Sequence, residues 1–162
     1  MYNTGGRAVY GTMFNRVAVD KPLTLRSVNG AQFTIIRGQK ASNGANGDGA
    51  IRCVYLANGA SLSGFTLTNG ATRAVSDYPI YSESSGGGFW CESTNGVMVS
   101  NCVVTGNSAY VFGACAYQGT LKNCIVSSNS ASFGGGVFGC TLNNCTLIGN
   151  SANFGGGPTD AP

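Results

Sequence analysis

The sequence contains no histidine. This absence excludes a Ser-His-Asp triad, a Cys-His dyad and any metal site that relies on imidazole ligands. Charged residues make up only 9% of the 162 residues, against roughly 25% in ordinary soluble domains. The nine Lys and Arg residues form no run, so the sequence does not indicate a nucleic-acid-binding surface.

Two kinds of apolar segment are also missing. No apolar stretch approaches the roughly 18 residues that a membrane-spanning helix needs. The opening residues, MYNTGGRAVYG, lack the basic and apolar regions of a signal peptide. The closing residues, GGGPTDAP, match the start of another repeat. We therefore expect a single domain over 1–162 that is a fragment of a longer protein, secreted or displayed at the cell surface.

A repeat fills the C-terminal part of the chain. The segments SNCVVTGNSAYVFGA (100–114), KNCIVSSNSASFGGG (122–136) and NNCTLIGNSANFGGG (143–157) are near copies. Each places apolar residues at alternate positions, which is the period of a β-strand. One column of the alignment holds only Asn and Gly, which enter the left-handed backbone conformation at low cost, so we expect a tight bend there. Its members are Gly64, Asn101, Asn123 and Asn144.

Short strands joined by Asn and Gly corners, with a period of about 21–22 residues, are typical of a β-solenoid. Each coil then lies about 4.8 Å from the next, and equivalent side chains stack. We expect Cys102, Cys124 and Cys145 to form one interior ladder. A further ladder is expected from Phe133 and Phe154, together with Val111.

The pattern ΦxxNSA…FGGGVF…LxNC resembles the right-handed parallel β-helices of the pectate-lyase-like superfamily. It is similar in particular to the repeats of bacterial surface proteins of the polymorphic outer-membrane-protein type. Those repeats carry Gly-Gly-Ala-Ile-like and Phe-x-x-Asn elements, for which GGVF (135–138) and Leu147-x-x-Asn150 stand here. The resemblance implies an all-β fold, a right-handed parallel β-helix (single-stranded solenoid) of about five coils of 21–22 residues. Because this fold hosts lyases, hydrolases, adhesins and stalks, it says little about function.

The resemblance covers residues 50–157 well and 1–49 loosely. We expect 1–49 to form an irregular N-terminal coil and loop, in which Phe33 and Ile35 match Phe65 and Leu67. Asn69-Gly70-Ala71 matches Asn107-Ser108-Ala109 if one residue is skipped. These matches extend the solenoid pattern towards the N-terminus.

Two insertions break the rhythm, QKASNGANGDG (39–49) and TRAVSDYPIYSESSGG (72–87). One follows Gly38 and the other follows Gly70-Ala71, so both leave the coil at the same corner. We therefore expect them to be neighbours on one edge of the solenoid, here called the insertion edge. In repeat proteins, insertions on one face often carry the binding site.

The cysteines form no C-x-x-C pair, which argues against a zinc or redox site. Stacked strands hold equivalent β-carbons near 4.8 Å, wider than the roughly 3.8 Å of a disulfide. We therefore expect buried free thiols that pack as small apolar side chains. The seven are Cys53, Cys91, Cys102, Cys115, Cys124, Cys140 and Cys145.

Candidate site residues gather in and beside the two insertions. Asp77 and Glu83 are a carboxylate pair of the kind that glycosidases use, and Arg73 is a third catalytic candidate. Solvated loop charges would give the same sequence. Aromatic rings beside a polar rim suit sugar rings, although a loop that packs its own tyrosines onto the coil would look alike. The ligand-binding candidates are Arg37, Lys40, Asp48, Arg52, Tyr78, Tyr81, Trp90 and Glu92.

We expect a structural or adhesive module that interacts with a polysaccharide or a cell-surface glycan, without a cofactor or metal. The alternative is a carbohydrate-active enzyme, either a polysaccharide lyase or a glycoside hydrolase, acting at the insertion edge. The β-helix lyases hold calcium with several acidic residues, but residues 86–152 contain one carboxylate, Glu92. Calcium is therefore expected only under the lyase alternative. The low charge and the apolar cross-section of a solenoid also predict end-to-end self-association.

Overall fold

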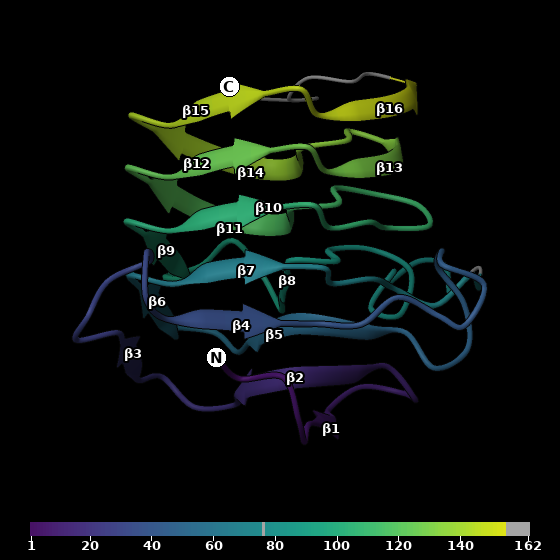
Figure 1. Cartoon of the computed structure of the whole chain (residues 1–162), viewed down its shortest axis with the longest axis horizontal. Helices are drawn as coiled ribbons and strands as arrows, with labels where there is room; N and C mark the ends of the chain where they lie inside the picture. Colours follow the sequence, from purple (N-terminus) through teal and green to yellow (C-terminus); the bar gives the residue numbers. More distant parts are fainter. Residues whose placement is uncertain (76, 155–162) are drawn as a thin grey trace.

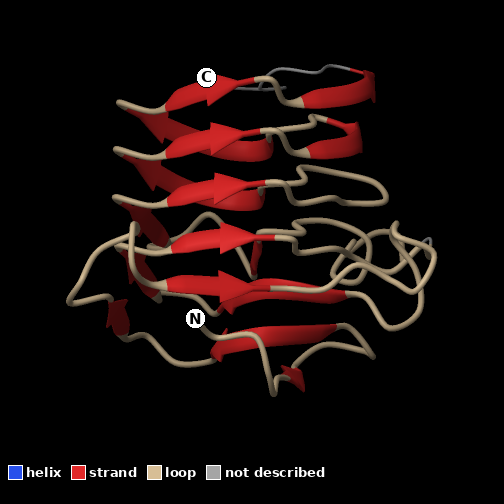
Figure 2. Cartoon of the chain, viewed as in Figure 1, coloured by secondary structure: helices blue, strands red, loops and turns tan. Residues whose placement is uncertain are grey.

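The structure is a computed structural model that describes residues 1–75 and 77–154. Over these ranges the chain is all-β, with no helix (Figure 2). The repeat expected to begin in GGGPTDAP falls on 155–162, outside the described residues. The strands are β1 (Arg7–Ala8), β2 (Phe14–Val19), β3 (Thr24–Arg26), β4 (Ile35–Arg37), β5 (Ile51–Leu56), β6 (Ser61–Ser63), β7 (Thr66–Thr68), β8 (Phe89–Cys91), β9 (Met98–Ser100), β10 (Val103–Thr105), β11 (Ala116–Lys122), β12 (Ile125–Ser127), β13 (Ser130–Phe133), β14 (Val137–Asn143), β15 (Thr146–Ile148) and β16 (Ser151–Phe154).

The strands are stacked in layers and form three sheets (Figure 1). The first has the order β1-β2-β5-β8-β11-β9-β6-β3, and β14 also pairs with β11. The second has the order β15-β12-β10-β7-β4, and the third pairs β13 with β16. Every pair of these strands is parallel except β1 with β2. Parallel strands in curled sheets are compatible with a β-helix-like solenoid.

The repeat period varies along the stack. In the layers near the C-terminus, here called the upper layers, equivalent residues of neighbouring layers are hydrogen-bonded to one another. Asn107 and Asn129 lie 22 residues apart, and Asn129 and Asn150 lie 21 apart. In the layers nearer the N-terminus, here called the lower layers, the spacing grows, and the hydrogen-bonded residues Ser63 and Ser100 lie 37 residues apart. The insertion 72–87 lies between these last two residues, so the lower layers have longer connections. The expected spacing of 21–22 residues therefore holds only for the upper layers.

The predicted bend is confirmed. Asn101, Asn123 and Asn144 have φ values of 51°, 54° and 50°, and Gly64 has a φ of 79°. The Asn144 side chain also donates to Asn123 Oδ1 at 2.8 Å, so the bends are linked from one layer to the next. A second left-handed column escaped the sequence analysis because its members differ in type. It contains Asn69, Gly106, Ser128 and Gly149.

A ladder of asparagine side chains runs through the interior, with Asn107 and Asn129 buried and Asn150 partly buried. The Nδ2 and main-chain N of Asn107 donate to Asn129 Oδ1 at 3.1 and 3.0 Å. Asn129 donates in the same way to Asn150 Oδ1, at 2.9 and 3.1 Å. Gly70 N donates to Asn107 Oδ1 at 2.8 Å, so Gly70 rather than Asn69 occupies this column. No residue is skipped, and the gap in the expected alignment was wrong.

The cysteine ladder is confirmed. The strand pairings place Cys102, Cys124 and Cys145 in one column, directly before the paired residues Val103, Ile125 and Thr146. All seven cysteines are free, and all except Cys145 are buried. They pack among aliphatic side chains of the main core, which includes the fully buried column Leu67, Val104 and Val126.

Two expected columns were wrong. Ile36, not Ile35, pairs with Leu67, so Thr34 lies at the inward position and Phe33 is 73% exposed. A shift of one residue moves every side chain of a strand to the opposite face. Phe133 and Phe154 do stack, with ring centroids 5.0 Å apart, but both are exposed instead of lying in the interior. Their partner in the layer below is Phe112, whose backbone pairs with Phe133, and not Val111.

Candidate functional site

The two insertions lie against one another on one edge of the molecule (Figure 1). They leave the stack where Gly38 and Gly70 are in close contact, because a Cβ atom on Gly38 would come within 2.5 Å of Gly70 Cα. Beyond that corner, Thr72 N donates to Asn46 Oδ1 at 3.1 Å, and Gly47 N donates to the Thr72 carbonyl at 3.0 Å. The insertion edge is therefore a packed pair of loops.

Arg73 links the insertions to the N-terminal segment. Its guanidinium lies 2.8 Å from Asp48 Oδ1 and 3.7 Å from Glu83 Oε2. The same group contacts the Thr12 hydroxyl, and Glu83 accepts hydrogen bonds from both the main-chain N and the hydroxyl of Thr12. Arg73 Nε is buried and has no hydrogen-bond partner among the described residues. The predicted site residues Arg73, Asp48 and Glu83 are thus brought together as one ion-paired cluster.

Asp77 has a different role from Glu83. Its carboxylate accepts hydrogen bonds from Glu83 N at 2.6 Å and Ser82 Oγ at 3.3 Å, and from Ser84 Oγ. These donors all belong to its own loop, so Asp77 fixes the path of the insertion. The two carboxylates proposed as a pair hold separate parts of the loops in this structure.

Arg52 lies in the interior, although the sequence analysis placed it among the ligand contacts. Its guanidinium donates to the carbonyls of Gly86 and Ser85, both at 2.8 Å, and to Asn15 Oδ1 at 2.9 Å. Burial lowers the pKa of Arg52 to about 9, and the charge of Asp77 partly opposes this shift. With its donors directed at the protein and its side chain buried, Arg52 supports the second insertion and is closed to a ligand.

A ladder of aromatic rings covers the outer face of the long sheet. Tyr55, Trp90, Tyr117 and Phe138 occupy equivalent positions on β5, β8, β11 and β14. Successive ring centroids lie 5.8, 6.2 and 5.9 Å apart, and the rings are stacked. Of these four, only Trp90 was a predicted ligand contact. The equivalence of Tyr117 and Phe138 in the repeats was the signal that could have identified the column.

A short strap, residues 9–12, crosses this ladder. Tyr10 contacts Tyr55 and Trp90, with ring centroids 5.9 and 5.8 Å away. Its hydroxyl donates to Glu92 Oε1 at 3.1 Å, while Thr12 at the other end of the strap is held by Glu83. Two carboxylates therefore fasten the strap, and Trp90 is buried beneath it with Nε1 unpaired among the described residues.

Glu92 is held by three donors. It accepts hydrogen bonds from Tyr10, from Asn58 N at 3.1 Å and from the Tyr55 hydroxyl. Burial alone would raise the pKa of Glu92, but the bonds from Tyr55, Asn58 and Tyr10 hold it below its ordinary value. The hydrogen bond to Glu92 raises the pKa of Tyr10, and burial raises the pKa of Tyr55. The strap is therefore anchored by an ionised carboxylate and neutral phenols at neutral pH.

The exposed part of the edge carries further aromatic and basic groups. Tyr78 is 77% exposed and contacts the partly buried Tyr81 edge-on, with ring centroids 5.8 Å apart. Tyr81 in turn packs edge-on against Phe112 at 4.9 Å. Arg37, at the end of β4, and Lys40, in the first insertion, are exposed. Of the predicted ligand contacts, Tyr78, Arg37, Lys40 and Asp48 are the ones open to solvent.

Comparisons with protein-family models, curated proteins and solved structures found no significant match to this chain. Over the described ranges, no three His, Cys, Asp or Glu side chains come together in a group suited to a metal ion. The same ranges contain no helix of the length and apolarity needed to cross a membrane.

Proposed function

We propose that this chain is a right-handed parallel β-helix of the pectate-lyase-like type, and that it is a structural and adhesive module of a secreted or cell-surface bacterial protein. The in-register parallel strands and the stacked Asn, Cys and aromatic columns support the solenoid. We propose further that its ligand is a largely neutral glycan, bound at the insertion edge.

The observation that carries the glycan proposal is the exposed ring of Tyr78 on a packed base. Tyr81 supports this ring from the side, and Phe112 supports Tyr81. Because the base is preformed, binding a sugar against Tyr78 orders few side chains. Asp48, Arg37 and Lys40 add exposed polar groups at the same edge for contacts with hydroxyls.

The experiment is affinity electrophoresis of the purified chain in gels containing soluble neutral polysaccharides, followed by calorimetric titration of any that retard it. Tyr78→Ala should weaken binding at least about tenfold, the range for a central aromatic contact. Phe33→Ala is the matched control, because Phe33 is a similarly exposed ring in a loop outside the insertions. Equal affinities for the two variants, or no retardation by any polysaccharide, would contradict the proposal. Cleavage of the polysaccharide would instead indicate a carbohydrate-active enzyme.

We also propose that copies associate through the layer formed by β14, β15 and β16. Leu142, Cys145 and Leu147 of this layer are only partly buried, whereas their equivalents in the layer below are buried. Residues 123–154 contain no Asp, Glu, Lys or Arg, so this layer has none of the charges that usually prevent strand edges from pairing.

A further inference from the structure

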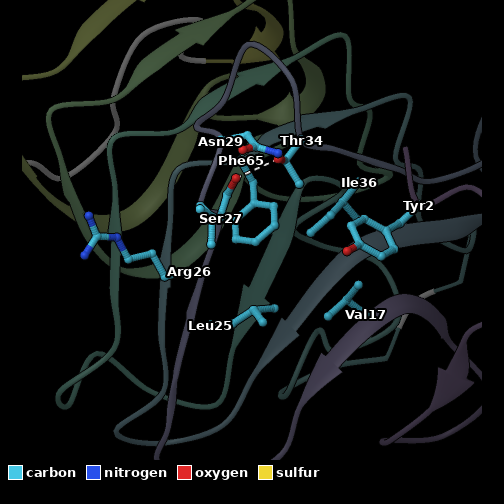
Figure 3. Close-up of a pocket in the computed structure, with 10 residues that line it drawn as sticks. Tyr2, Val17, Leu25, Arg26, Ser27, Asn29, Thr34, Ile36 and Phe65 are labelled. Carbon is cyan, nitrogen blue, oxygen red and sulfur yellow. Dashed lines mark hydrogen bonds between the residues drawn. The ribbon is translucent and has the colours of Figure 1, made fainter.

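A cavity of about 480 Å³ lies in the first layer, away from the insertions (Figure 3). Its apolar wall consists of inward-facing side chains of β2, β3 and β4, with Phe65 from the following layer. A volume of this size is typical of small-molecule sites, which range from roughly 300 to 1,000 Å³. The residues that matter for its chemistry are Tyr2, Val17, Leu25, Thr34, Ile36 and Phe65.

The cavity arises from the register of β4. Thr34 lies in the column that Phe65 and Cys102 occupy in the layers above, because Ile35 pairs with Thr66 and Thr66 pairs with Val103. The large side chain in this segment, Phe33, points outward and is exposed. With Thr34 facing inward in place of Phe33, no aromatic ring from this segment fills the space next to Phe65.

Two of the strand edges beside the cavity, those of β4 and β2, are partly covered. Tyr2 N donates to the Ile35 carbonyl at 2.7 Å, and Arg37 N donates to the Tyr2 carbonyl at 2.9 Å, so Tyr2 covers the edge of β4. The edge of β2 is paired with β1 through Arg7 and Ala8. Among the described strands β3 pairs only with β6, so the choice of a small molecule as the occupant rests on the volume of the cavity and on the groups that line it.

The polar groups of the cavity select a neutral ligand. Ser27 Oγ donates to Thr34 Oγ1 at 2.6 Å, which leaves the Thr34 hydroxyl proton available to an acceptor. The Tyr2 hydroxyl points into the cavity, whereas the guanidinium of Arg26 points away from it (Figure 3). The aromatic rings of Tyr2 and Phe65 line the apolar part.

We propose that this cavity binds a small uncharged aromatic molecule that carries one hydrogen-bond acceptor, such as an aryl ketone or ester. The ring fills the space beside Phe65 and Tyr2, and the acceptor receives the Thr34 or Tyr2 hydroxyl. This site is separate from the insertion edge and does not depend on glycan binding.

The probe is prodan, an uncharged naphthyl ketone whose emission shifts to the blue in apolar surroundings. Titration of the whole chain should give saturable binding to one site with a blue shift. Thr34→Leu fills the cavity and should weaken binding at least about tenfold, a loss that corresponds to about 1.4 kcal/mol. Thr68→Leu is the matched control, because the same substitution on the outer face of β7 leaves the cavity unchanged.

Two further variants separate the contributions. Thr34→Val keeps the shape but removes the hydroxyl, and should weaken binding about three- to tenfold, as expected for one hydrogen bond. Tyr2→Ala removes one side of the cavity, and because Tyr2 is exposed this change should leave the fold intact. If Thr34→Leu loses its β-sheet circular dichroism, the affinity of Tyr2→Ala for prodan is the test of the site. The proposal would be overturned if prodan showed no saturable binding. It would also be overturned if Thr34→Leu bound prodan as tightly as Thr68→Leu, or if Tyr2→Ala bound it as tightly as the unchanged chain.

Discussion

Replacement of Asn129 by alanine tests whether the buried asparagine ladder stabilises the stack. Asn129 is fully buried, and its side chain makes four hydrogen bonds to three residues in its two neighbouring layers. Alanine leaves the buried main-chain N–H of Asn107 without a partner, and it also removes the side-chain bonds to the Val104 carbonyl and to Asn150 Oδ1. The unpaired N–H costs about 1–3 kcal/mol and each of the two other lost bonds about 1 kcal/mol, so we expect a loss of about 4 kcal/mol in the free energy of unfolding.

The assay is thermal unfolding followed by circular dichroism, together with urea titration. For a chain of this size, a loss of 4 kcal/mol lowers the Tm by roughly 8–16 °C. The control is Asn43→Ala, because Asn43 is exposed and accepts one bond, from Ala45 N within its own turn. This change should cost about 1 kcal/mol or less. If the two variants lose the same stability, the ladder does not hold the layers together and the reasoning is refuted.

Three other predictions concern the bend, the thiols and the upper layer. Asn123→Val should cost at least about 1–2 kcal/mol more than Asn123→Gly in thermal melts, because φ is 54° at this position, and equal losses would refute the bend. Ellman's reagent should modify only Cys145 in the native chain, since the other six thiols are buried. This reaction should be faster at pH 9 than at pH 7, because burial raises the pKa of the Cys145 thiol. Rapid modification of several thiols would contradict the fold. Light scattering across a concentration series should show self-association that Leu147→Lys reduces and Thr105→Lys does not, whereas a strict monomer would exclude the proposed interface.

The sequence predicted the upper layers well because the repeats there are nearly identical. Asn101, Asn123 and Asn144 share their column with Gly64, and Asn and Gly together favour the left-handed conformation, so this bend could be assigned from the alignment. The Asn107, Asn129 and Asn150 column, which contains no left-handed residue, shows that asparagine by itself does not decide the conformation. The cysteine column followed from the same alignment. Ser128 could not be assigned in this way, because a serine in a left-handed bend has no distinct sequence signal.

The lower layers were harder to predict because period-2 patterns are ambiguous by one residue. Phe33 and Ile35 alternate as well as Thr34 and Ile36 do, and only the strand pairing shows which pair faces inward. The cavity depends on that choice and was therefore missed. The same holds for Arg52, whose burial depends on carbonyls of a loop that begins 20 residues later in the chain, at Thr72.

The adjacency of the two insertions was predicted, but the contacts around them were predicted only in part. The shared corner at Gly38 and Gly70 placed the two insertions together correctly. The strap over the aromatic ladder was not foreseen, because residues 9–12 are far in sequence from Glu83 and Glu92, which fasten it. Long-range contacts of this kind leave no periodic signal in a single sequence.

The most direct test of the central claim, a stack of parallel layers in register, is a nuclear Overhauser experiment on the isotopically labelled chain. We expect parallel-strand contacts between Val103 and each of its two partners, Thr66 and Ile125, and between Ile125 and Thr146. Short Hα–Hα contacts typical of antiparallel pairs among these residues, or contacts in a register shifted by one residue, would contradict it.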